Sequence, residues 1–332
     1  MEKLLTIVVP VYNTEKYLSK CLDSLIVRKY MEHLEILVVI DGSPDNSAKI
    51  AREYEIKFPN TFTVVEKENG GHGSAINKGL ELATGKYFRV LDSDDWFDEA
   101  NFETFINRLS SATEDVVMTH LMREYISIEK SVLWGNDNIR YDYSYTDFSV
   151  LDSLDVNFFG MGRCTYKTEK LKEYNLQLLE KRSFEDTFLH VFPLLFMRSF
   201  VFYNMVVYHY YLERPEQSVK QKVTIKQCND WKALIEQIIA FYMYNQISLN
   251  DERKNFVLKA LKKYTEEEYL RINSLPYNEA RKGLKAYHTH LKSFPIYYNI
   301  IGKHGQTYAS MPYFIFRSAR AIYVWLVITF KN

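Results

Sequence analysis

The chain has 332 residues, enough for one large domain and a smaller one. Hydrophobic residues make up 47% and charged residues 25%, as in ordinary soluble globular proteins. Lys and Arg number 42 and balance the 42 Asp and Glu, so a general nucleic-acid-binding protein is not expected. The three cysteines are odd in number and lack metal-ligand spacing, which predicts free thiols in a reducing compartment.

The first two thirds of the chain alternate apolar, strand-like runs with segments of helical spacing. Strands are predicted at residues 5–12, 35–40, 61–65, 87–91, 115–119, 158–166 and 200–211, with helices at 14–27, 45–57, 74–83, 101–109 and 185–195. This alternation indicates an α/β fold, a mostly parallel sheet covered by helices on both faces. Ligands bind beyond the carboxyl ends of such strands, so the polar segments found there predict one shared site. These segments are residues 10–13, 41–43, 67–73 and 92–95.

The acidic segment that begins at Asp92 follows a buried strand. Asp92 and Asp94 are two residues apart, so in an extended segment their carboxylates point the same way. Such oxygen ligands suit Mg²⁺ or Mn²⁺, which completes its coordination with water and substrate phosphate. The alternative is a turn whose solvated acids cap the next helix.

Two further motifs allow both a functional and a purely structural interpretation. Five of the 12 glycines lie between Gly70 and Gly85. They suit close backbone approach to phosphate or sugar, but also a strand-to-helix connection that needs positive φ. Glu185 and Asp186 begin a predicted helix, where acids complement the helix dipole; the pattern alone favours this role. One of them could instead face the crevice as a general base.

The last third of the chain has helical spacing. We predict a first domain at residues 1–215 and a helical C-terminal domain at residues 216–332, with helices at 231–244, 252–264, 267–272 and 278–291. The uncharged run 321–330 is too short to span a bilayer. It could lie on a membrane surface, pair with another subunit in a homo-oligomer, or complete the helical core.

Five motifs in the first domain resemble those of family 2 glycosyltransferases, which have the Rossmann-like GT-A fold. In chain order they are Ile7-Val-Val-Pro-Val-Tyr-Asn13, Val39-Ile-Asp-Gly-Ser-Pro-Asp45, Asn69-Gly-Gly71 with Ala75-x-Asn77-x-Gly79, Gly85-Lys-Tyr-x-x-x-Leu-Asp-Ser-Asp-Asp95, and Phe184-Glu-Asp186. One departure is Ile76, because many relatives have arginine there. The missing guanidinium puts in doubt a helix contact to the donor, for which His72 could substitute.

The resemblance implies a set of residues that bind the donor, a nucleotide sugar. They are Pro10, Val11, Tyr12, Asp41, Asn69, Gly71, His72, Asp92, Ser93 and Arg214. Residues 10–12 would form the wall beside the nucleotide base, and Asp41 would bond that base, usually uracil. Arg214 would close on the donor phosphates.

The resemblance also implies metal-binding and catalytic residues. Asp94 and Asp92 match a DxD motif that would hold Mn²⁺ or Mg²⁺, with His209 as a third ligand. Asp186 matches the general base of an inverting transfer, which reverses the preference drawn from the pattern alone. Glu185 is its neighbour and rival.

The activity implied is metal-dependent, inverting transfer of one sugar from a nucleoside-diphosphate donor, with UDP expected, to a hydroxyl acceptor. The acceptor would be a glycan, a lipid-linked glycan or a glycoprotein in the synthesis of a bacterial surface glycan or polysaccharide. The alternative is a non-catalytic subunit that supports a partner glycosyltransferase. The cytoplasm, or a peripheral position at the inner face of the cell membrane, is the expected location.

Overall fold

The computed structural model describes residues 2–135, 139–212, 223–294 and 298. By their contacts the residues form two compact units, of which the first takes residues 1–221 with 245–253 and the second takes 222–244 with 254–332. The predicted boundary between residues 215 and 216 falls outside the described residues. Within the described part, no helix combines the length and apolar character needed to cross a bilayer.

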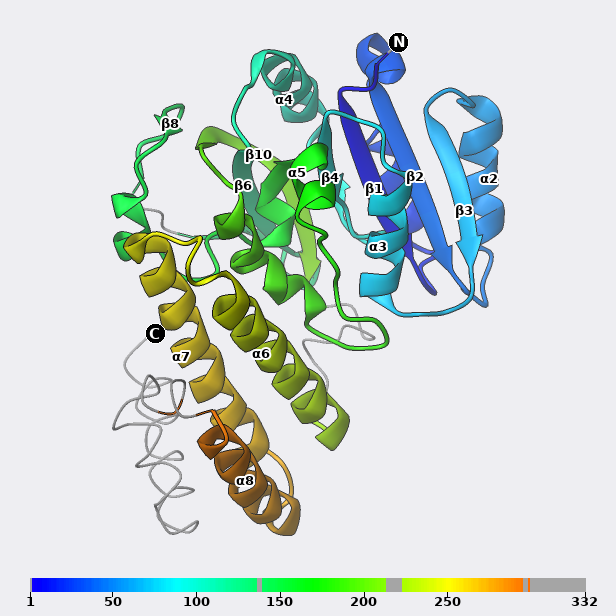
Figure 1. Cartoon of the computed structure of the whole chain (residues 1–332). Helices are drawn as coiled ribbons and strands as arrows, with labels where there is room; N and C mark the ends of the chain where they lie inside the picture. Colours follow the sequence, from blue (N-terminus) through cyan, green and yellow to red (C-terminus); the bar gives the residue numbers. More distant parts are fainter. Residues whose placement is uncertain (1, 136–138, 213–222, 295–297, 299–332) are drawn as a thin grey trace. The chain divides into compact units, whose positions relative to one another are not determined.

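Among the described residues, the first unit is built on one mixed sheet of ten strands (Figure 1). They are β1 (Leu5–Val11), β2 (Leu34–Asp41), β3 (Phe62–Lys67), β4 (Tyr87–Val90), β5 (Trp96–Phe97), β6 (Val116–Tyr125), β7 (Lys130–Leu133), β8 (Ser144–Tyr145), β9 (Cys164–Lys167) and β10 (Phe200–Leu212). The order is β3-β2-β1-β4-β9-β6-β10-β5, with β7 on β6 and β8 on β10. β3, β2, β1 and β4 run parallel, so their carboxyl ends share one edge.

Helices and 3-10 turns connect these strands. The helices are α1 (Leu18–Asp23), α2 (Ser47–Lys57), α3 (His72–Leu82), α4 (Glu99–Ser111) and α5 (Thr168–Glu173); the turns are η1 (Arg28–His33), η2 (Ile126–Ile128), η3 (Ser149–Ser153), η4 (Met161–Arg163), η5 (Glu185–His190) and η6 (Phe192–Leu195). The helix predicted at 14–27 is reduced to α1, and the one at 185–195 is two 3-10 turns. Pro193 explains the second difference, because it lacks the amide proton that a continuous helix would use.

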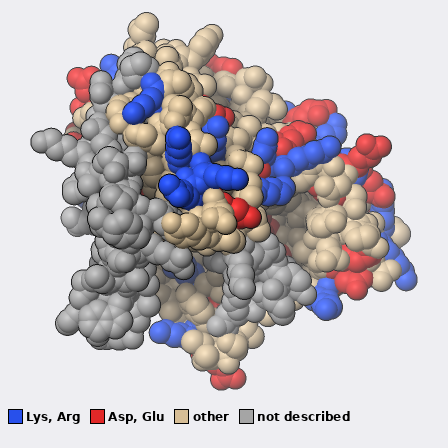
Figure 2. Space-filling view, turned by 90° about the horizontal axis from the view of Figure 1, so that it is seen from below, with Lys and Arg blue, Asp and Glu red and all other residues tan. Residues whose placement is uncertain are grey.

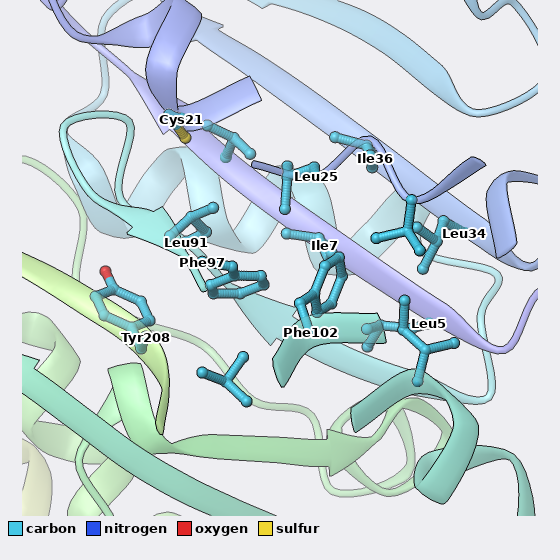
Figure 3. Packing of buried hydrophobic residues seen from close by; sticks show 14 of the residues in the cluster. Leu5, Ile7, Cys21, Leu25, Leu34, Ile36, Leu91, Phe97, Phe102 and Tyr208 are labelled. Atoms are coloured by element: carbon cyan, nitrogen blue, oxygen red, sulfur yellow. The ribbon is translucent and has the colours of Figure 1, made fainter. Parts of the chain in front are cut away.

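Alternate residues of β1 point to opposite faces of the sheet. Ile7 belongs to a buried cluster that also takes in Leu25, after α1, and Phe102 of α4 (Figure 3). Val8 points to the other face, where Gly79 of α3 lies directly against it. Both faces are therefore covered by helices, as the apolar strands predicted.

The sheet differs from the predicted mostly parallel one because β9 is antiparallel to both neighbours, β4 and β6. Arg89 of β4 is fully buried at this junction. Its guanidinium donates to Oγ1 of Thr119 (3.0 Å), the carbonyl of Gly162 (2.9 Å) and Oγ1 of Thr165 (3.2 Å). Burial lowers the pKa of Arg89 to about 10, which leaves it charged at neutral pH. These bonds tie the three strands together.

The second unit consists of α6 (Ile225–Asn245), α7 (Asp251–Asn273, whose first residues group with the first unit) and α8 (Tyr277–Lys292). The helices predicted at 252–264 and 267–272 are one continuous helix. Nε1 of Trp231 donates to the carbonyl of Tyr264 at 2.9 Å, which joins α6 to α7. The rings of Tyr269 and Tyr287 meet edge to face at 5.1 Å and join α7 to α8. The predicted helical C-terminal region is confirmed, whereas its tail after residue 298 lies outside the described residues.

Candidate active site

The carboxylate of Asp41, the last residue of β2, organises the loop that follows β3. Its Oδ1 accepts hydrogen bonds from Nζ of Lys67 (2.7 Å) and the amide of Gly70 (2.9 Å), and its Oδ2 accepts from the amide of Gly71 (2.7 Å). The side-chain amide of Asn69 donates to the Asp41 carbonyl at 2.9 Å. Asp41 is only 2% exposed. It therefore holds the glycine-rich loop in place, and its contact with a nucleotide base stays a prediction.

A second loop packs on the glycine-rich loop and leads into the Glu185-Asp186 pair. The amide of Lys181 donates to the carbonyl of Gly70 at 2.6 Å. Gly71 has φ +86°, and a Cβ atom there would lie 3.2 Å from the Lys181 nitrogen. Both the backbone conformation and the close approach therefore favour glycine at position 71. Part of the glycine signal thus serves packing within the chain.

His72, the first residue of α3, joins the two acidic motifs. Its Nε2 lies 2.8 Å from Oδ1 of Asp92, and its Nδ1 lies 2.7 Å from Oε1 of Glu185. Burial alone would lower the pKa of His72, but the two carboxylates outweigh it and raise this pKa well above its usual value. The imidazole is therefore a cation that donates one hydrogen bond to each acid. The contact with Glu185 spans 113 positions of the chain, and the contact with Asp92 spans 20.

Glu185 and Asp186 differ in their access to solvent. Glu185 is 3% exposed and bonded to His72, whereas Asp186 is half-buried. Burial raises the pKa of Asp186 to about 7, and the negative charge of Glu185 adds to the rise while the charge of His72 opposes it. Phe184 precedes the pair with φ +70°, a left-handed conformation that is costly for a residue other than glycine. Asp186 is thus the more accessible acid, with a pKa suited to proton transfer near neutral pH.

The third acid after β4, Asp95, anchors the acidic segment to β10. Its Oδ2 accepts from the hydroxyl of Tyr208 at 2.6 Å, and its Oδ1 accepts from the amide of Tyr211 at 2.8 Å. Asp95 is 1% exposed, and burial together with the charges of Asp94 and Asp92 raises its pKa well above the usual value. Asp92 and Asp94 are each partly exposed on this anchored segment. The sequence pattern did not predict that Asp95 anchors this segment to β10. Its one indication was a third acid directly after the DxD motif.

The other predicted donor-binding residues have different environments. Pro10 and Val11 are buried within β1, whereas the next residue, Tyr12, is 53% exposed. Ser93 is buried. Arg214 lies outside the described residues. Of the predicted wall for the nucleotide base, Tyr12 is therefore the member with a side chain open to a ligand.

His209 of β10 belongs to a separate polar cluster. Its Nδ1 lies 2.6 Å from Oε1 of Glu124, and its Nε2 lies 3.6 Å from Oδ2 of Asp98. Its ring stacks on Trp96 with centroids 5.4 Å apart. These contacts give His209 carboxylate partners of its own and lend no support to its predicted role as a metal ligand.

Asp92 and Asp94 suit a divalent cation that a substrate helps to hold. Among the residues that the structure describes, no group of three or more His, Cys, Asp or Glu is arranged to bind a metal. However, Mg²⁺ is commonly bound by one or two carboxylates together with water and substrate phosphates. Asp92 gives one oxygen to His72 and keeps the other. The residues present therefore fit a cation that a diphosphate completes.

Comparisons with known sequences show which family contains these motifs. Residues 6–174 match the family described as Glycosyl transferase family 2. The putative glycosyltransferase EpsH of Bacillus subtilis (strain 168) is 30% identical over 256 residues, which cover 75% of this chain and 72% of EpsH. Glycosyltransferase GlyA of Streptococcus pneumoniae serotype 4 is 29% identical over 232 residues. That match covers 63% of this chain but only 31% of GlyA, so the chain corresponds to about a third of that relative.

Solved structures share the fold. TarS residues 1–349 of S. aureus, in complex with UDP, have a TM-score of 0.60 at 19% identity, covering 96% of this chain and 91% of that one. Mannosyltransferase PcManGT from Pyrobaculum calidifontis, in complex with GDP-Man and Mn²⁺, has a TM-score of 0.57 at 15% identity, covering 97% of this chain and 88% of that one. At these identities the likeness concerns the fold alone, and it confirms the predicted GT-A architecture.

Proposed function

This chain belongs to glycosyl transferase family 2, and we propose that it moves one sugar from a nucleoside-diphosphate sugar to an acceptor hydroxyl with inversion at the anomeric carbon. The observation that carries the proposal is the His72 bridge, which joins Asp92 to the Glu185-Asp186 pair. These contacts support a single site that holds the proposed donor-side acids and the proposed base. The enzyme class follows from the family, whereas the donor, the metal and the base are proposed.

Asp186 is the proposed general base. Its carboxylate takes the proton from the acceptor hydroxyl while that oxygen attacks the anomeric carbon from the face opposite the diphosphate. The bond from the anomeric carbon to the diphosphate oxygen breaks in the same displacement, and the nucleoside diphosphate leaves. A pKa of about 7 keeps a useful fraction of Asp186 ionised at neutral pH, yet leaves it basic enough to accept a proton.

Mn²⁺ or Mg²⁺ is the proposed cofactor, held by Asp94 with the free oxygen of Asp92. When bound, such an ion offsets the negative charge that develops on the departing diphosphate. His72 keeps Asp92 turned toward the site, and Asp95 fixes the segment through Tyr208. The Mn²⁺ in the PcManGT structure supports a divalent ion in this fold.

UDP is the proposed nucleotide, supported by the TarS complexes with UDP and UDP-GlcNAc. Tyr12 would stack on the base, and the glycine-rich loop held by Asp41 would lie beside it. The proposed acceptor is a surface glycan, a lipid-linked glycan or a glycoprotein. The proposed location is the cytoplasm, supported by three buried free cysteines, at residues 21, 164 and 228, with contact to the membrane or to a second copy through the C-terminal region.

A panel of nucleotide sugars tests this function. Each donor is incubated with the chain and Mn²⁺, and released nucleoside diphosphate is measured along with the shift in melting temperature. A preferred UDP-sugar should raise the melting temperature by mass action and release UDP. Stabilisation and release with GDP-sugars alone would contradict the UDP assignment, and the absence of both stabilisation and release with every donor would favour the non-catalytic subunit.

A further inference from the structure

Charge is segregated along this neutral chain. Eight of the 42 Lys and Arg, and none of the 42 Asp and Glu, lie after Glu279. The last 53 residues therefore carry a formal charge of +8, and the 279 before them carry −8. Such asymmetry indicates that the C-terminal part meets an anionic partner.

Helix α8 presents part of this charge as one stripe. Arg281, Lys285 and Lys292 are all exposed. At 3.6 residues per turn they fall within about 40° of one another around the helix and span about 16 Å along it. Lys282 is a fourth exposed cation on the same helix, whereas Glu279 is its only acid. Lys and Arg side chains also gather near the middle of the face shown in Figure 2.

In the described part of the second unit, the stripe makes one side-chain contact, with the Lys292 ammonium 6.0 Å from the ring centroid of Tyr298. Within the described residues none of Arg281, Lys285 and Lys292 forms an ion pair, so their charge is not compensated there. The other side of α8 does the packing, through Tyr287 and Leu291, which are 4% and 1% exposed. The helix is thus held by its apolar side with its basic side turned outward.

We propose that this stripe docks the chain on a bilayer that carries anionic phospholipid. Juxtaposed Lys and Arg bind such surfaces by electrostatic attraction. Exposed Tyr277, at the start of α8 and one helical turn before Arg281, adds the kind of aromatic residue that favours the interface between water and lipid. This inference specifies the membrane contact of the proposed function, and it does not depend on catalysis.

Two other anionic partners fit the observations less well. Nucleic acid would also attract the stripe, but the other 279 residues carry a charge of −8 and would be repelled by a polyanion that surrounds them. A second copy could place its acidic part against α8. A planar anionic surface contacts one face only, which suits a basic stripe confined to one side of α8.

Vesicle co-sedimentation of the full chain tests the proposal. Binding is expected to vesicles of phosphatidylcholine with added phosphatidylglycerol, not to phosphatidylcholine alone, and it should weaken as NaCl is added. A variant with Arg281→Gln, Lys285→Gln and Lys292→Gln should bind roughly 100-fold more weakly, since each basic residue near an anionic surface contributes about fivefold. Donor turnover should be unchanged in this variant, which shows that it folds.

The matched control carries Lys29→Gln, Lys49→Gln and Lys57→Gln, which remove the same charge from exposed sites of the first unit. It should bind vesicles like the unmodified chain. Equal loss in both variants, or binding that ignores phosphatidylglycerol, would overturn the proposal. So would a stripe-dependent dimer in light scattering without lipid, or tighter stripe-dependent binding to RNA than to vesicles. Each of these results is independent of whether any sugar is transferred.

Discussion

Nε2 of His72 lies 2.8 Å from Oδ1 of Asp92, a bond that joins the first residue of α3 to the segment after β4. The second ring nitrogen is bonded to Glu185, so one cation stands among three acids. That cation also lowers the pKa of Asp186 against the opposing effects of burial and of Glu185. His72 is therefore a positioning residue whose charge tunes the neighbouring base.

Replacing His72 with alanine should raise the pKa of Asp186, because the opposing positive charge is lost. In a plot of rate against pH, the rise on the acidic side should then move to higher pH. A purely structural defect would lower the rate without moving this rise. Buried Glu185 would also lose its partner, at a cost of about 1–3 kcal/mol in the free energy of unfolding. His33→Ala is the control. If the rise of the rate with pH stays at the same pH in His72→Ala, His72 does not tune the pKa of Asp186.

The unmodified enzyme should itself show a base that titrates near neutrality. Only ionised Asp186 can take the acceptor proton, so the rate should rise with pH through about 7 and level off above it. Initial rates of UDP release from pH 5 to 9 in buffers of constant ionic strength would measure this. A rate that falls over the same range would show that a protonated group is required instead.

Asp94→Ala should remove the metal dependence of nucleotide binding. Calorimetry of UDP with and without Mn²⁺ should give a clear gap in affinity for the unmodified chain, and almost none for the variant, because the diphosphate would lose its shared ion. Glu99→Ala removes an exposed acid five positions along the chain and should leave the gap intact. An unchanged gap in Asp94→Ala would mean that the ion is bound elsewhere.

Asp41→Asn should destabilise the first unit. The variant keeps the shape of the side chain but loses the negative charge that pairs with Lys67. In addition, the new side-chain NH₂ group would point at the backbone N–H of Gly70 or Gly71, which now donates to the Asp41 carboxylate. The expected cost is about 1–3 kcal/mol, measured by urea unfolding. Glu53→Gln, at an exposed site on α2, is the control. Unaltered stability in Asp41→Asn would show that the loop does not depend on this carboxylate.

Local patterns predicted the strands β1 to β4 and the polar ends that meet at their carboxyl edge. These features are predictable because the spacing of apolar residues indicates a strand or a helix within a short stretch of sequence. The contacts that complete the site depend on distant residues and left no local signal. Examples are the bond between His72 and Glu185, and that between Tyr208 and Asp95. A strand was predicted at 158–166, but the antiparallel direction of β9 was not, because the residues that pair with it and with Arg89 come from elsewhere in the chain.

The neighbouring acids Glu185 and Asp186 offer a matched pair of variants that tests the proposed base most directly. UDP affinity and UDP release should be measured for Asp186→Asn and Glu185→Gln with the preferred donor. Asp186→Asn should keep UDP affinity and lose roughly 10² to 10⁴-fold in turnover, while Glu185→Gln, whose amide oxygen can still accept from His72, should lose much less. Near-normal turnover in Asp186→Asn, together with an inactive Glu185→Gln, would contradict the account.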